Sequence, residues 1–60
     1  MQIDLTAEEA SVIRDLLEGL LPDLRREIAR TDDHAFRHQL VLRQELAERL
    51  VTRLGDRVRS

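Results

Sequence analysis

Two histidines and a neighbouring carboxylate are the residues of this chain that are best spaced to bind a metal. His34 and His38 lie four positions apart, which on a helix places two imidazoles on one side, and Asp33 precedes them. No glutamate follows His34 as in the zinc-protease pattern, and helical rotation directs both histidines away from the apolar positions of the same segment. We therefore expect exposed histidines at a helix start, and we predict no metal site and no cofactor.

Residues for acid–base or nucleophilic catalysis are also poorly placed. The chain has twelve carboxylates, but acid–base catalysis needs them in a water-poor pocket, which two helices are not expected to enclose. The sequence has no glycine-rich phosphate loop, and its two serines, Ser11 and Ser60, have no plausible histidine neighbour. We predict that the chain is not an enzyme.

The first element that positions these residues is a helix expected at about residues 7–30. Thr6 and Glu9 have the spacing of a capping box, which marks a helix start. Pro22 interrupts the pattern that follows, but the pattern keeps its phase, so we expect one kinked helix, with a break near Leu21 as the alternative. The pattern consists of apolar residues at three- and four-residue steps: Ala10, Ile13, Leu16, Leu17, Leu20, Leu24 and Ile28.

A second helix is expected at about residues 34–54. The polar connector over residues 31–33 offers an aspartate as its N-cap, and Gly55 has the position of a C-terminal stop. A short connector between two amphipathic helices favours an antiparallel arrangement. The sequence thus predicts an all-α fold, an antiparallel two-helix hairpin that forms a single domain over residues 1–60.

The apolar surface of this hairpin predicts self-association. Sixty residues are near the lower limit for a single core, and the absence of cysteine leaves a partner as the remaining source of stability. Facing pairs in the hairpin would be Ile28 with Phe36, Leu24 with Leu40, Leu17 with Ala47, Ile13 with Val51 and Ala10 with Leu54. A second apolar edge emerges on one side of both helices, so we predict a homodimer in the form of a four-helix bundle. Its interface is expected to contain Val12, Leu16, Leu20, Gln39, Leu42, Arg43, Leu46 and Leu50.

Arg43 lies between Leu40 and Ala47, on the line of the second helix that is expected to face inward. Two interpretations are open. Its guanidinium could pair with Glu27 or Asp23 of a second copy, because an unpaired buried charge is costly. Alternatively, its stem packs on apolar neighbours and its head reaches water.

The charge balance and apolar runs limit the classes of partner. Ten basic and twelve acidic residues give a formal net charge of −2, and the chain has one aromatic residue, so nucleic-acid binding is disfavoured. No apolar run is long enough to span a membrane, and the first five residues do not resemble a signal peptide. We expect a cytoplasmic protein with no membrane contact.

Three segments carry a resemblance: LTAEEA at 5–10, LRREIARTDDHAFR at 24–37 and LVLRQELAERL at 40–50. Together they resemble a family of small uncharacterised bacterial helical-hairpin proteins, and this resemblance implies a fold but no activity. The architecture is also similar to the plasmid repressor-of-primer proteins, hairpin dimers that bind paired RNA loops, although the surface that would match their RNA face mixes Arg14 and Arg25 with carboxylates. The expected function is therefore a small homodimeric interaction or structural module that can also present its charged faces to another protein. An RNA-binding regulator is the alternative.

Overall fold

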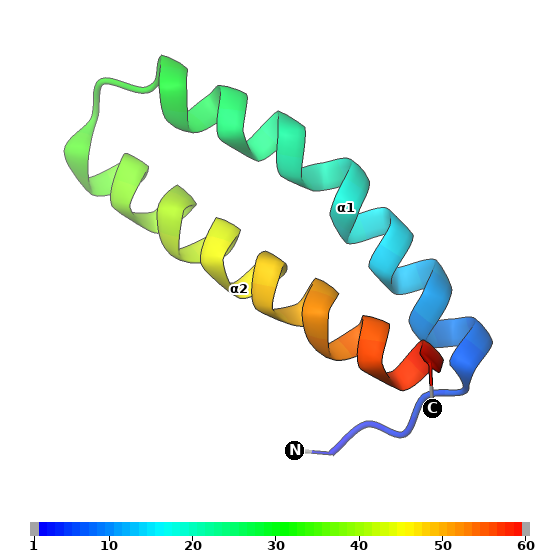
Figure 1. Cartoon of the computed structure of the whole chain (residues 1–60). Coiled ribbons are helices and arrows are strands. Elements are labelled where there is room, and N and C mark those ends of the chain that lie inside the picture. Colours follow the sequence, from blue (N-terminus) through cyan, green and yellow to red (C-terminus); the bar gives the residue numbers. More distant parts are fainter. Residues whose placement is uncertain (1, 60) are drawn as a thin grey trace.

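The fold of the chain is a two-helix hairpin, as the sequence predicts. The computed structural model describes residues 2–59 and contains α1 (Ala7–Arg30) and α2 (His34–Arg59), which run antiparallel and pack against each other (Figure 1). The described residues contain no strand, so the expected all-helical class is confirmed. The molecule measures 41 × 23 × 13 Å. Its smallest extent is close to the diameter of one helix, so the hairpin is a single layer of secondary structure.

The start of α1 is fixed by the predicted capping box. The Thr6 hydroxyl accepts a hydrogen bond from the Glu9 backbone amide at 3.0 Å, and the Glu9 carboxylate accepts one from the Thr6 amide at 2.9 Å. The helix then continues through Pro22 to Arg30. The alternative of a break near Leu21 is therefore wrong. Pro22 is exposed, which leaves the carbonyl that loses its helical partner open to water.

α2 starts as expected but ends later. Asp33 Oδ1 accepts a hydrogen bond from the Phe36 amide at 3.1 Å, which confirms an aspartate cap. The helix continues past Leu54 to Arg59, so the prediction that Gly55 stops it is wrong. No described residue has a positive φ, and Gly55 is therefore a glycine inside a helix and not a left-handed C-terminal cap.

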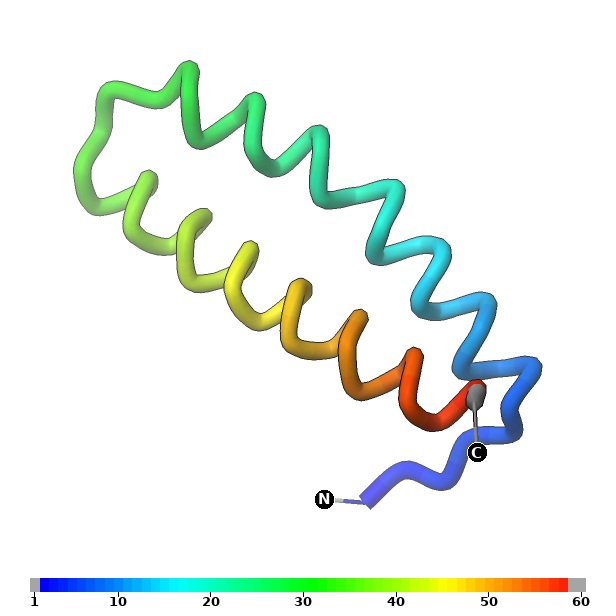
Figure 2. Tube along the Cα trace, viewed as in Figure 1, coloured from blue at the N-terminus to red at the C-terminus, as the bar shows by residue number. Residues whose placement is uncertain are grey.

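The N-terminal segment contacts the last turn of α2, which follows Gly55. Residues 2–6 lie outside the helices and run beside the C-terminal end of α2, as the trace in Figure 2 shows. Arg57 Nε and Nη2 both donate to the Leu5 carbonyl, at 3.0 and 2.8 Å. Val58 is half-buried, so the last turn of α2 also packs against the protein. These contacts stabilise helix beyond the glycine.

The core is small and follows one line along each helix. The buried residues among those described are Ala10, Leu21, Leu24, Leu40 and Ala47. We define the inner lines as these residues together with half-buried ones at alternating three- and four-residue steps. The inner line of α1 is Ala10, Arg14, Leu17, Leu21, Leu24 and Ile28. The inner line of α2 is Arg37, Leu40, Gln44, Ala47, Val51, Leu54 and Val58.

The observed register differs from the predicted one. Phe36 is 45% exposed and is therefore not part of the buried core, where the sequence places it opposite Ile28. Arg37 is the first residue of α2 to reach α1, where its Nη2 donates to the Thr31 carbonyl at 2.5 Å. The midpoint of this contact is residue 34, two positions beyond the predicted centre at residue 32.

Arg43 does not take the inward position that the sequence predicts. Arg43 is exposed, and the next residue, Gln44, takes the half-buried position on the inner line of α2. The prediction that Arg43 faces inward within the hairpin is therefore wrong. Leu21 is buried although it stands outside the predicted stripe, and Ile13, which stands inside it, is 37% exposed.

Candidate functional site

A second line of side chains, all exposed, lies beside the inner line of each helix. On both helices this line has the same alternating steps as the inner line, and all twelve of its residues are exposed. We call these lines the outer stripes. The α1 outer stripe is Glu9, Ile13, Leu16, Leu20, Asp23 and Glu27, and the α2 outer stripe is Gln39, Arg43, Leu46, Leu50, Arg53 and Arg57.

Large apolar side chains occupy the middle of both outer stripes. Leu16 is 69% exposed and Leu46 is 54% exposed, and Leu20 and Leu50 also remain exposed. A leucine that becomes fully buried contributes about 1.5–3 kcal/mol relative to one in water. A marginal chain of this size therefore gains substantially if these leucines are covered.

The two outer stripes face the same side of the hairpin. Helical rotation of about 100° per residue, together with the opposite directions of the helices, places both on one face. An open hollow of about 570 Å³ supports this placement, because it is lined by Ile13 of α1 and by Leu50 and Arg53 of α2. Arg25 and Glu48, whose side chains pair at 3.7 Å, lie by the same rotation on the opposite face.

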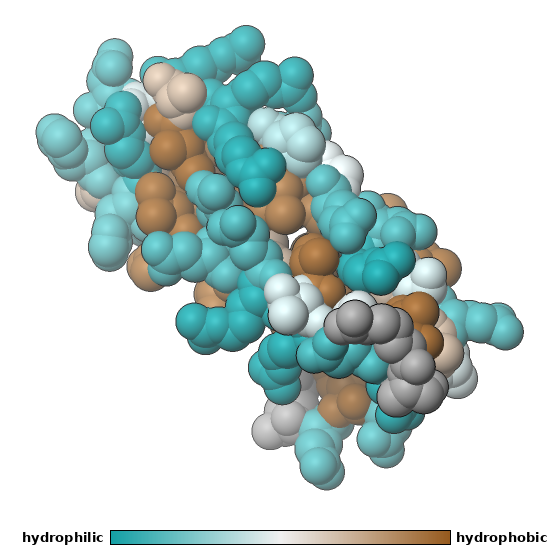
Figure 3. All heavy atoms as spheres, viewed as in Figure 1, coloured by the Kyte–Doolittle hydropathy of each residue, from teal (hydrophilic) through white to brown (hydrophobic). Residues whose placement is uncertain are grey.

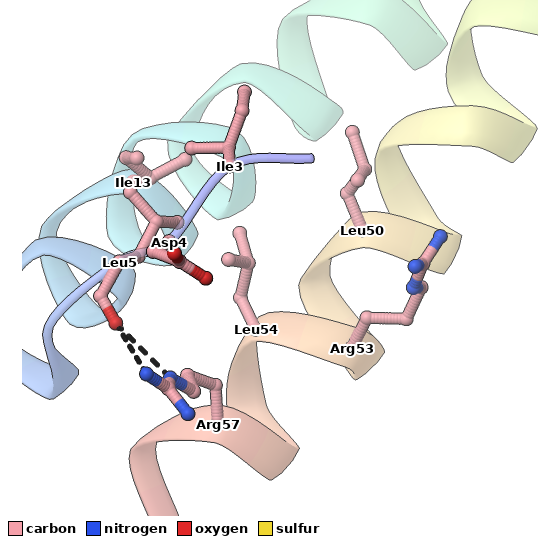
Figure 4. Close-up of a pocket in the computed structure, with 8 residues that line it drawn as sticks. All are labelled: Ile3, Asp4, Leu5, Ile13, Leu50, Arg53, Leu54 and Arg57. Carbon is pink, nitrogen blue, oxygen red and sulfur yellow. Dashed lines mark hydrogen bonds between the residues drawn. The ribbon is translucent and has the colours of Figure 1, made fainter. Parts of the chain in front are cut away.

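That hollow lies at the open end of the hairpin, under the N-terminal segment. In Figure 4, Ile3 and Leu5 of this segment surround it together with Ile13, Leu50 and Leu54. The sequence predicts no pocket here, because it does not show that residues 2–5 fold back over the helices. The polar lining consists of Asp4, Arg53 and Arg57. This lining contains no nucleophile paired with a base.

Most of the residues predicted for the interface lie on the outer stripes. Leu16 and Leu20 of α1 stand on one stripe, and the other carries Gln39, Arg43, Leu46 and Leu50. Val12 and Leu42 are also exposed but lie one step further around each helix, at the margin of this face. Ile13 is the residue that sequence reasoning missed. Its spacing from Glu9 and Leu16 is the signal that places it on the outer stripe.

The two histidines are on the surface, and Arg14 and Arg25 lie beside carboxylates. His34 and His38 are exposed, and residues 2–59 contain no group of three or more histidines and carboxylates that could hold a metal. Arg14 Nε lies 3.9 Å from the Glu18 carboxylate, and Arg25 pairs with Glu48. The arginines that correspond to an RNA-binding face therefore already lie beside carboxylates.

The hydropathy of the molecular surface is consistent with a single layer of two helices that covers its core only in part. Figure 3 shows a face that is mostly hydrophilic, with hydrophobic side chains in patches along the line between the helices. Neither helix, within residues 2–59, has a stretch that is long and apolar enough to cross a membrane.

Comparisons with family models, with curated proteins and with solved structures give no match for this chain. The resemblance to bacterial helical-hairpin proteins therefore stays a prediction, and the functional argument rests on the surface of the hairpin itself.

Proposed function

We propose that this chain is a small interaction or structural module that works as a homodimer, in which the outer stripes of two copies pack together as a four-helix bundle. The supporting observation is the row of exposed leucines on one face of a single-layer hairpin. A domain needs at least two packed layers to enclose a core, and a second copy provides the missing layer. The cytoplasm is the compartment that we expect for this module.

The surface area supports a partner of this size. A folded monomer of this length exposes about 4,000 Å², whereas this chain exposes 4953 Å², roughly 900 Å² more. Stable interfaces bury about 800 Å² on each partner. The excess exposed area is therefore close to what one dimer interface removes from water.

The mass in solution tests this proposal. Sedimentation equilibrium over a concentration series should give a species of twice 7.0 kDa that dissociates only on dilution. A folded monomer of 7.0 kDa, unchanged up to high micromolar concentration, would contradict it.

A variant of the outer stripe identifies the surface involved. Leu16→Gln should weaken the dimer by about 10-fold or more, because the lost apolar burial occurs in both copies. Ala29→Gln is the control, since Ala29 is exposed on the same helix but lies by helical rotation on the opposite face. Equal effects of the two substitutions would argue against this surface. Circular dichroism separates loss of the dimer from loss of the helices.

An RNA-binding regulator, the alternative from sequence, gains no support from the described residues. Arg25 is engaged by Glu48, and Arg14 is half-buried beside Glu18 and Asp15. Phosphate contacts need accessible basic groups, and they make affinity fall steeply with salt. A gel-mobility shift of labelled RNA by the protein, weakening as salt is added, would support this alternative.

A further inference from the structure

The charged residues of the two outer stripes have opposite signs. Those of the α1 outer stripe are all acidic: Glu9, Asp23 and Glu27. Those of the α2 outer stripe are all arginines: Arg43, Arg53 and Arg57. The face that carries the exposed leucines is thus negative along one helix and positive along the other. A surface of this kind is complementary to a second copy of itself only in certain orientations.

Three charged side chains on this face, Glu27, Arg43 and Arg53, make no hydrogen bond or ion pair with another residue of the described chain. Asp23 differs, because its carboxylate pairs with Arg26 one turn later on α1. Glu27 and Arg43 are therefore available to a second copy.

The contacts between the helices show which residues lie at the same level along the hairpin. Arg37 reaches Thr31, and the Arg14 side chain lies so close to Gly55 that a Cβ at this glycine would be 3.7 Å from Arg14 Nη1. The midpoints of these two contacts are residues 34 and 34.5, whereas that of the Arg25–Glu48 pair on the opposite face is 36.5. A centre at residue 34 also matches the two inner lines residue by residue, so we take the levels to be mirrored about it. With this register, Arg43 stands at a level between those of Asp23 and Glu27, on the other helix.

The leucines follow the same register. The level of Leu20 on α1 falls between Leu46 and Leu50 on α2, and that of Leu16 falls between Leu50 and Arg53, so the apolar middles of the two outer stripes overlap along the hairpin. Each end of the α1 outer stripe is acidic, and the corresponding end of the α2 outer stripe carries arginine.

We infer that the two copies pair with their turns at the same end, so that α1 of each copy lies on α2 of the other. A two-fold axis along the bundle produces this arrangement and keeps every residue at its own level. Arg43 of each copy then meets Asp23 and Glu27 of the other, and leucine meets leucine between them. This inference rests on the proposed function, because it specifies the orientation of the proposed dimer.

The opposite orientation places like charges together. If the turns were at opposite ends with the same faces in contact, α1 would lie on α1 and α2 on α2. Matching Leu16 with Leu20 on the two α1 helices sets Glu9 against Glu27, and the same two-fold axis sets Arg43 against Arg57 on the two α2 helices. Juxtaposed like charges disfavour an interface, so the segregated stripes select the same-end dimer.

A distance between spin labels decides between the orientations. The chain has no cysteine, so Asp32→Cys in the exposed turn gives one labelling site for each copy. With the turns at one end, the labels should be roughly 20 Å apart, about two helix spacings. With the turns at opposite ends, they would be separated by about the 41 Å length of the hairpin.

Charge reversal tests the assigned pair independently. Arg43→Glu and Glu27→Arg should each weaken the dimer by about tenfold, and the double variant should return to within about threefold of the natural chain. Arg25→Glu and Glu48→Arg are matched controls, because these exposed residues pair with each other on the opposite face and should leave the dissociation constant within about threefold. Effects of equal size in the controls would overturn the assignment.

These experiments distinguish a failure of the proposed orientation from a failure of the proposed homodimer. A monomer in sedimentation equilibrium overturns both. A dimer whose label distance is near 41 Å overturns the orientation and leaves the homodimer standing. A dimer with a short distance and rescue by the double charge reversal supports both.

Discussion

Arginine is the only basic residue type in this chain besides histidine, and individual arginines close both ends of the hairpin. Arg37 donates to the Thr31 carbonyl at the turn, and Arg57 donates twice to the Leu5 carbonyl at the open end. A planar guanidinium has several donors in a fixed arrangement, so it can bind a carbonyl while its stem packs on apolar neighbours. Hydrogen bonds from arginines thus connect the chain at both ends of the small core, although the sequence alone suggests that these arginines are surface charges.

The cap of α2 gives a prediction at the scale of one residue. Asp33→Ala removes the acceptor of the Phe36 amide and should lower the free energy of unfolding by about 1 kcal/mol. Asp32→Ala is the control, because Asp32 has the same charge and is exposed, but makes no hydrogen bond with the described residues. Urea denaturation of both variants measures the difference. Equal losses would mean that charge at the helix start, and not the cap, stabilises α2.

At the scale of elements, what could be predicted depends on whether the signal is local. The capping box at Thr6 and the aspartate cap of α2 are local, and both are confirmed. The end of α2 depends on Arg57 and the Leu5 carbonyl, which are far apart in the sequence. Gly55 alone signals a stop, so the last turn could not be predicted from α2 by itself.

The conformation of Gly55 gives a prediction for this element. Gly55→Ala should stabilise the protein by about 0.5–1 kcal/mol, because alanine loses less backbone entropy than glycine in a helix. The added Cβ would meet Arg14 at 3.7 Å, an ordinary contact. Gly19→Ala is the comparison, since no atom of the described chain lies within 4 Å of its Cβ position. Thermal unfolding measures both. Destabilisation by Gly55→Ala alone would indicate the left-handed stop that the sequence suggests.

For the whole molecule, sequence predicts the presence of excess apolar surface better than its exact position. The exposed edges through Leu16 and Leu46 follow from periodicity alone, and both residues are exposed in the structure. The side on which Arg43 and Ile13 stand depends on the rotation of each helix about its own axis, which periodicity fixes only to within about one residue. A small rotation of α2 that keeps Leu40, Ala47 and Val51 inside is enough to place Gln44, and not Arg43, on the inner line.

This excess surface also predicts how stability should depend on concentration. If burial of the outer stripes couples folding to dimer formation, each tenfold increase in chain concentration adds about 1.4 kcal/mol and should raise the unfolding temperature by about 5 °C. Leu16→Gln should abolish most of this dependence, whereas Ala29→Gln should keep it, because only Leu16 stands on an outer stripe. Scanning calorimetry over a roughly 100-fold concentration range makes the measurement. An unfolding temperature that stays constant for the natural chain would mean that one hairpin is stable with its leucines in water.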